Sequence, residues 1–124
     1  MSELLSMSAG ELARAIRARS ISSVEAMQAV LPAARRAHAR LNCFVRIDEE
    51  GALAAARASD AALARGRNAG PLAGVPMAHK DMYYREGECS SCGSKITRDR
   101  PAPATATALK RLDAAGAVQF GVLN

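Results

Sequence analysis

The chain has 124 residues, which is enough for one small domain or a piece of one and too few for two. Apolar residues make up 49% of it and charged residues 23%, a balance that excludes an intrinsically disordered chain. The net charge of +5 comes mainly from arginines interleaved with acidic residues, and two tyrosines and two phenylalanines leave little for base stacking, so we expect no direct nucleic-acid partner. Residues 1–8 lack the pattern of a signal peptide and no apolar run approaches bilayer-spanning length, so we expect no membrane partner and a cytoplasmic location.

Two helix starts of the same kind lie near the beginning of the chain. Ser8 with Glu11, and Ser22 with Glu25, have the spacing of a capping box, in which the serine and glutamate side chains each accept a backbone N–H of the first turn. Apolar residues at helical spacing follow each box. This pattern predicts one helix that ends near residue 19 and a second that runs toward residue 40.

Two residues of the second helix need separate comment. Pro32 has no backbone N–H to donate, so we expect a kink there or a break at Leu31. His38 falls on the apolar face of the same helix, where we expect a packed or partly exposed residue rather than a metal ligand.

A short extended segment and an alanine-rich helix follow. Apolar residues recur along residues 41–47, which is typical of a strand. Asp48 can then cap a third helix from about Glu49 to Arg65. Because alanine has little side-chain area to bury, that helix must pack closely against a larger element. A glycine-containing break at 66–70 ends this part, so residues 1–69 are predicted to form a helical segment.

The second part of the chain, residues 70–124, has a different pattern. The stretches 75–80 and 117–122 are apolar and predict strands, and 105–115 between them predicts a helix that Gly116 ends. Two apolar strands joined through a helix favour a parallel pair in an α/β sheet covered on both faces. The stretch 82–104 is long, irregular and rich in Ser, Gly, Cys and Pro, and a loop of that length in a compact unit is usually functional.

Lys80 stands at the end of the first of these strands and is the residue most suggestive of chemistry. A lysine buried there without compensation must lose its proton or find a partner, and a neutral lysine is a usable general base. The plainer alternative is an exposed strand-end lysine paired with Asp81 or Glu86. By strand alternation His79 points to the opposite face, where we expect it to pack. Asp81 is expected to anchor the loop by hydrogen bonds rather than to act as an acid or base.

Cys89 and Cys92 form a Cys-x-x-Cys pair within the long loop. Such a pair occurs in redox sites and as half of a zinc site. A zinc site needs two further ligands, and only Cys43, His38 and His79 are available, while a redox pair should open a helix after a strand. We therefore expect reduced thiols in a loop and no metal site.

Four motifs in a fixed order resemble the amino-terminal part of an amidase signature enzyme. They are Gly70-Pro71-Leu72-Ala73-Gly74-Val75-Pro76, then Lys80-Asp81, then Ser91-Cys92-Gly93-Ser94-Lys95, and then Ala115-Gly116-Ala117-Val118. The preceding helices and the segment 41–45 are similar as well, so the resemblance spans nearly the whole chain. It implies that residues 1–124 are the amino-terminal portion of a single amidase domain. The implied fold class is α/β, with helices packed around a mixed, largely parallel β-sheet, incomplete in this chain.

The resemblance also implies a catalytic site. Enzymes of this family cleave an amide bond with a Ser, cis-Ser, Lys triad, and Lys80 stands where the family has its catalytic lysine. Asp81, Gly93 and Ser94 would belong to the supporting active-site loop, and the implied chemistry uses no metal and no cofactor. The two serines of the family lie downstream of a point equivalent to Asn124. We therefore expect an amino-terminal fragment that is catalytically inactive by itself.

The function favoured by the sequence is an amidase that hydrolyses the C–N bond of a small-molecule carboxamide. The alternative is the glutamine-hydrolysing subunit of a tRNA-dependent amidotransferase, which shares the fold and the triad. Met82 and Tyr83 after the lysine, and His79 before it, depart from the usual pattern of that subunit. A third hypothesis is a truncated, non-catalytic relic. The partners that the resemblance allows are a second copy in a homodimer or the other subunits of an amidotransferase.

Overall fold

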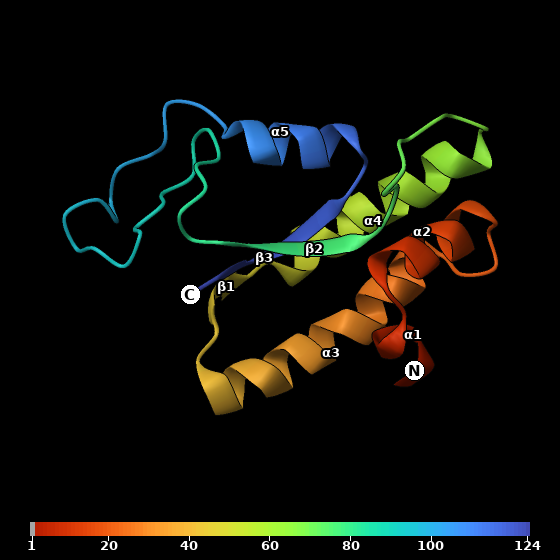
Figure 1. Ribbon diagram of the computed structural model, residues 1–124, viewed down its shortest axis with the longest axis horizontal. Helices are drawn as coiled ribbons and strands as arrows, with labels where there is room; N and C mark the ends of the chain where they lie inside the picture. The colour runs from red at the N-terminus through yellow and green to blue at the C-terminus, as the bar shows by residue number, and fades with distance from the viewer. Residues whose placement is uncertain (1) are drawn as a thin grey trace.

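A computed structural model describes residues 2–124 and places helices on both sides of a small sheet (Figure 1). The elements in chain order are α1 (Ser2–Ser6), α2 (Ala9–Arg17), α3 (Ser23–Leu41), β1 (Phe44–Ile47), α4 (Glu49–Ala64), β2 (Pro76–Lys80), α5 (Thr107–Ala114) and β3 (Val118–Leu123). The short helix α1 has no counterpart among the predicted elements. From α2 onward the predicted order of helices and strands is confirmed.

The two predicted capping boxes start α2 and α3. The Ser8 hydroxyl accepts the Glu11 N–H at 3.3 Å, and the Glu11 carboxylate accepts the Ser8 N–H at 2.8 Å. The same exchange joins Ser22 and Glu25, at 3.0 and 2.8 Å. Each box satisfies N–H groups that the helix itself leaves free, which is why both helices begin where the sequence predicts.

Helix α3 runs without interruption through Pro32, so the break that we considered at Leu31 is wrong. The proline removes one intrahelical hydrogen bond. The residues around it are nevertheless held in the core, with Met27, Leu31 and Ala34 exposed by only 0%, 3% and 7%. Packing of both halves of the helix on one core outweighs a local cost of about 3 kcal/mol.

The three strands form one sheet in the order β1-β3-β2. Strands β2 and β3 are parallel, as predicted, and β1 pairs with β3 in the antiparallel direction. The sheet is therefore mixed. Because β2 and β3 run the same way, their carboxyl ends lie at one edge of the sheet.

Helices α3 and α4 cover one face of this sheet, and α5 lies across the other (Figure 1). Phe44, Val118 and Phe120 of the sheet share a buried cluster with residues of both helices. Ala52 and Ala56 of α4 are 1% and 0% exposed in that cluster, which confirms the predicted close packing of the alanine-rich helix. Helices thus lie on both sides of the parallel pair (Figure 1).

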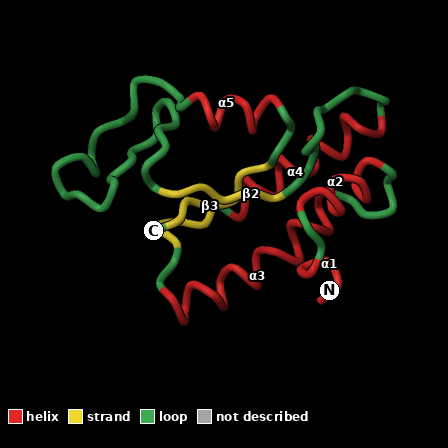
Figure 2. Tube along the Cα trace, in the orientation of Figure 1, coloured by secondary structure: helices red, strands yellow, loops and turns green. Residues whose placement is uncertain are grey.

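A second small cluster fixes the segment that leads into β2. Ile16 of α2 and Ala26 of α3 pack with Val75. The buried hydroxyl of Ser23 donates to the carbonyl of Gly74 at 2.6 Å. The strand that carries Lys80 is therefore held at its start by the amino-terminal helices. Beyond its other end, a long loop leads to α5 (Figure 2).

Candidate functional site

Lys80 ends β2 at the carboxyl edge of the parallel pair. It lies opposite Leu123 of β3, and the next residue, Asp81, donates its N–H to the Leu123 carbonyl at 2.8 Å. Ligands of open α/β sheets bind outside the carboxyl ends of parallel strands. Lys80 therefore stands where a site is expected in such a sheet.

The side chain of Lys80 is exposed, so the expectation that residues of this chain bury it is wrong. The physical reason lies in the path of the loop, which is tied to α5 and to β1 and not laid over the lysine. The plainer alternative is right about the exposure of Lys80 and wrong about its ion pair. Within residues 2–124, neither Asp81 nor Glu86 forms an ion pair with Lys80.

A tight turn follows Lys80. Its carbonyl oxygen accepts the N–H of Met82 at 2.7 Å and that of Tyr83 at 3.2 Å. The second of these is the bond from residue i to residue i+3 that is typical of a β-turn. The main chain on both sides of the lysine Cα is thus fixed, by the ladder to β3 before it and by the turn after it.

Asp81 is 8% exposed and anchors the loop, as predicted. Its two carboxylate oxygens accept the N–H of Ser91 at 3.1 and 3.2 Å, and one of them also accepts the Ser91 hydroxyl. Hydrogen bonds to an ionised group are roughly twice as strong as neutral ones. Both oxygens are engaged by a single residue, so the arrangement serves to hold the loop.

Ser91 is the centre of the loop that follows. Its hydroxyl accepts the N–H of Gly93 at 3.1 Å, and its carbonyl accepts the N–H of Ser94 at 2.8 Å and the Thr97 hydroxyl at 2.7 Å. The Ser94 hydroxyl accepts the N–H of Ile96 at 3.2 Å. Hydrogen bonds within residues 91–97 therefore hold this part of the loop together, and Asp81 links it to the end of β2.

Three of the four predicted site residues line one open hollow of about 420 Å³. They are Asp81, Gly93 and Ser94, and the other lining residues are Val45, Arg46, Cys89, Ser91, Lys95 and Arg98. The volume lies within the range of roughly 300–1,000 Å³ usual for small-molecule sites. Lys80 is not among the lining residues, although it directly precedes Asp81.

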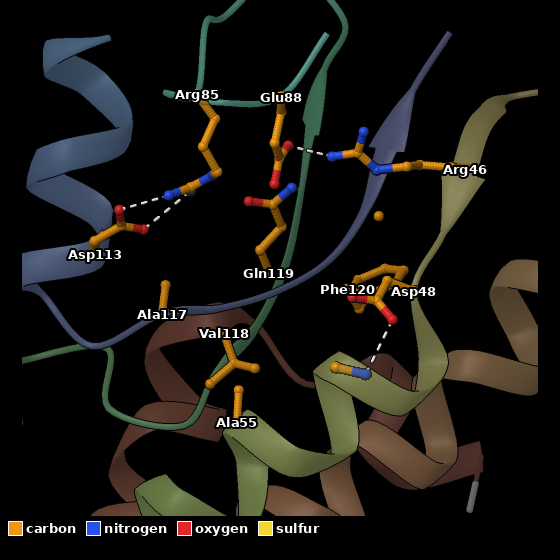
Figure 3. Close-up of a pocket in the computed structure, with 12 residues that line it drawn as sticks. Arg46, Asp48, Ala55, Arg85, Glu88, Asp113, Ala117, Val118, Gln119 and Phe120 are labelled. Atoms are coloured by element: carbon orange, nitrogen blue, oxygen red, sulfur yellow. Dashed lines mark hydrogen bonds and ion pairs between the residues drawn. The ribbon is translucent and has the colours of Figure 1, made fainter. Parts of the chain in front are cut away.

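Two ion pairs tie the base of the loop to the rest of the fold (Figure 3). Arg85 donates to both carboxylate oxygens of Asp113 in α5, at 2.8 and 3.1 Å, and Glu88 pairs with Arg46 of β1. The hydrogen bond to Asp113 raises the pKa of the Arg85 guanidinium, against a smaller lowering by burial. Between the two pairs is a second hollow over β3, into which Gln119 points (Figure 3).

The candidate metal ligands of the sequence were its histidines and cysteines. His38 is half-buried and accepts the N–H of Phe44 at 3.2 Å, in line with the predicted packed or partly exposed role. Cys43, Cys89 and Cys92 are free thiols. In the described part of the chain, no group of three His, Cys, Asp or Glu residues is placed to hold a metal ion. Among the helices described for residues 2–124, none combines the length and the apolar character that a bilayer crossing requires.

The sequence did not identify Ser91, Arg85 or Asp113 as residues that position the loop. Ser91 meets Asp81 across 10 positions and Arg85 meets Asp113 across 28, and in both cases the irregular loop lies between the partners. A weak local signal exists for Ser91, because serine readily bonds nearby backbone groups in loops. For the ion pair between the loop and α5, no signal in the sequence could have selected these two residues.

Comparison with known proteins connects these features to a family. The family model described as Amidase matches residues 25–124. The A subunit of the glutamyl-tRNA(Gln) amidotransferase of Azoarcus sp. (strain BH72) is 46% identical over 121 residues, which cover 98% of this chain and 25% of that protein. Curated relatives of the same name in other bacteria are 42–51% identical. The chain spans about a quarter of the length of the curated relatives that it matches.

Solved structures with the same fold include several hydrolases. Fatty acid amide hydrolase superposes with a TM-score of 0.94 at 26% identity, over 99% of this chain and 22% of that one. A structure described as a vestigial protein complex that reveals the origins of an s-triazine catabolic enzyme gives a TM-score of 0.86 at 37% identity, over 95% of this chain and 26% of that one. The α/β fold class implied by the sequence is thereby confirmed.

Proposed function

This chain belongs to the amidase family, and on that premise we propose that Lys80 is the general base of an enzyme that hydrolyses the C–N bond of a carboxamide. The single observation that carries the proposal is the position of Lys80. It ends a parallel strand at the carboxyl edge of the sheet and directly precedes an anchored loop. Residues 1–124 would be the amino-terminal portion of one amidase domain, with a helical segment at 1–69 and the lysine strand, loop, helix and second strand at 70–124.

The proposed chemistry is a proton relay of three residues, of which this chain supplies the lysine. The neutral amine of Lys80 accepts a proton from a cis-serine, whose hydroxyl oxygen accepts the proton of the nucleophilic serine. The serine oxygen attacks the amide carbon, and collapse of the tetrahedral intermediate breaks the C–N bond while the relay returns a proton to the departing nitrogen. Water then attacks the acyl-enzyme by the same relay and releases the carboxylic acid.

A lysine can act as a base only while its amine is neutral, which requires that it be withdrawn from water or placed near another positive charge. Lys80 is exposed within residues 2–124. In the proposal, the segment that carries the two serines covers the strand end and excludes water from the amine. The 124-residue chain alone is then expected to have no amidase activity.

Asp81, Gly93 and Ser94 are proposed to support the site without taking part in bond breaking. The Asp81 carboxylate is occupied by Ser91 at both oxygens, which suits an anchor and not a proton carrier. Gly93 and Ser94 are held through the same Ser91 and line the hollow beside the strand end. Their proposed task is to form one wall of the site for a small-molecule amide.

A second candidate function is supported by the curated relatives. Those at 42–51% identity are named as the A subunit of glutamyl-tRNA(Gln) amidotransferase, which favours glutamine as the amide and partner proteins as recipients of the ammonia. The chain departs from the usual pattern of that subunit at His79, Met82 and Tyr83. Because of these departures, the free-standing amidase stays our first proposal. The two candidates share the base and the bond cleaved, and differ in where the ammonia goes.

The experiment that tests the proposal begins with the reading frame beyond Asn124. A downstream Gly/Ser-rich segment with two serines is expected, and the protein that includes it should release ammonia from simple amides without other subunits. Activity seen only with glutamine and partner subunits would establish the second candidate instead. A stop codon with no such segment in the gene would leave a non-catalytic relic and contradict both.

A further inference from the structure

The two histidines of this chain are held by hydrogen bonds of opposite sense. In His38, Nδ1 lies 3.2 Å from the N–H of Phe44, which can only donate, so this Nδ1 carries no proton. In His79, Nδ1 lies 3.1 Å from the main-chain carbonyl oxygen of Lys80, which can only accept. The Nδ1 of His79 must therefore carry a proton, and the two rings are assigned different tautomers.

The other nitrogen of the His79 ring has no partner in residues 2–124. The side chain is 8% exposed, and Nε2 is fully buried without a hydrogen bond in this part of the chain. An N–H on Nε2 would be left unpaired there, which costs more than an unpaired lone pair. His79 is thus assigned a proton on Nδ1 and a free lone pair on Nε2.

His79 also contacts the far side of the turn. Its ring meets the Tyr83 ring edge to face, with 6.5 Å between centroids and 78° between planes. The N–H of Tyr83 in turn donates to the same Lys80 carbonyl that the histidine bonds. The His79 ring and the Tyr83 N–H therefore both bond the Lys80 carbonyl, and the two rings contact each other beside the lysine main chain.

We infer that His79 is a positioning residue for Lys80, acting through the Nδ1–H bond to the lysine's own carbonyl. The lysine amine is reached through four rotatable bonds, so its position depends on how firmly the main chain at its root is held. The histidine adds a side-chain donor to the two backbone donors of the turn, which an aliphatic residue at position 79 cannot do. The functional part of this inference rests on the proposed role of Lys80 as the base.

The test is nitrogen NMR on the chain labelled with ¹⁵N in its histidine rings, in which His38 serves as the internal control. The expected spectrum has one ring of each tautomer, with Nδ1 protonated in His79 and Nε2 protonated in His38. Substitution of one histidine at a time assigns the two rings. Finding His79 protonated on Nε2 instead would overturn the inference.

Three substitutions then test the link to Lys80. In His79→Asn the side-chain amide can take the place of Nδ1–H, in His79→Gln it lies near the former Nε2, and His79→Leu keeps only the apolar volume. The carbonyl ¹³C resonance of Lys80 is expected to move upfield in the Leu and Gln variants and to return toward its original position in the Asn variant. An unchanged resonance in all three would overturn the inference. Neither measurement needs turnover, so a failure of Lys80 as the base, seen as retained activity in Lys80→Ala, is recognised separately.

Discussion

Replacing Asp81 by alanine is expected to release the long loop from the end of β2. The substitution removes both acceptor oxygens and leaves the N–H and hydroxyl of Ser91 unpaired in a half-buried position. A hydrogen bond to a charged group contributes about 1.5–3 kcal/mol. Because the contacts share one donor residue and water can partly replace the carboxylate, we expect a net loss of about 2–3 kcal/mol in the free energy that holds the loop closed.

Amide hydrogen exchange measures this loss directly. Since about 1.4 kcal/mol corresponds to a factor of ten, the amides of Ser91, Gly93 and Ser94 should exchange about 30 to 150 times faster in the variant. The matched control is Ser94→Ala, which removes only an acceptor for Ile96 in an exposed turn and should change stability by less than about 0.5 kcal/mol. Unchanged exchange of the Ser91 amide in Asp81→Ala would refute the assignment of Asp81 as the anchor.

Two further predictions concern the scaffold. Gly74 has φ +77°, and a Cβ there would lie 2.8 Å from the Cβ of Ser23, so Gly74→Ala should lower the free energy of unfolding by more than about 2 kcal/mol. Gly66→Ala, at φ +70° with open space around it, should cost only about 1 kcal/mol; equal losses in urea unfolding would contradict this account. Hydrogen bonds from Ser22 hold the pKa of the Glu25 carboxyl below its ordinary value of 4.5. The ionised Glu25 therefore adds to the free energy of unfolding above pH 4.5, and this contribution is lost as the pH falls through the lowered pKa. Glu25→Gln should flatten the dependence of the free energy of unfolding on pH in that acidic range, and a dependence identical to that of the parent chain would contradict the role of this capping box.

The fold could be predicted where a few neighbouring residues decide the structure. The boxes at Ser8 and Ser22 each need only four residues, and both helices begin at them. Asp48 caps α4 for the same reason, and Gly116, with φ +88°, follows the end of α5. The parallel pairing of β2 and β3 could be predicted because a strand, helix and strand in succession favour that arrangement.

The parts that could not be predicted depend on contacts between distant residues. Helix α3 continues through Pro32 because the core holds both of its halves, and a local propensity carries no information about that core. The exposure of Lys80 depends on the direction in which the loop leaves the strand. The Arg85–Asp113 and Arg46–Glu88 ion pairs tie the start of that loop to α5 and β1, and no sequence pattern joins their partners.

The measurement that tests the central claim most directly is the kcat/KM of Lys80→Ala for amide hydrolysis, in the protein that includes the downstream segment. A general base contributes about 10²–10⁴-fold, so kcat/KM should fall by at least about 100-fold. The melting temperature of the 124-residue chain alone should not change, because there the Lys80 side chain is exposed and forms no ion pair within residues 2–124. Lys110→Ala, which removes an exposed lysine from α5, is the matched control and should keep full activity. Activity retained in Lys80→Ala would contradict the assignment of Lys80 as the base.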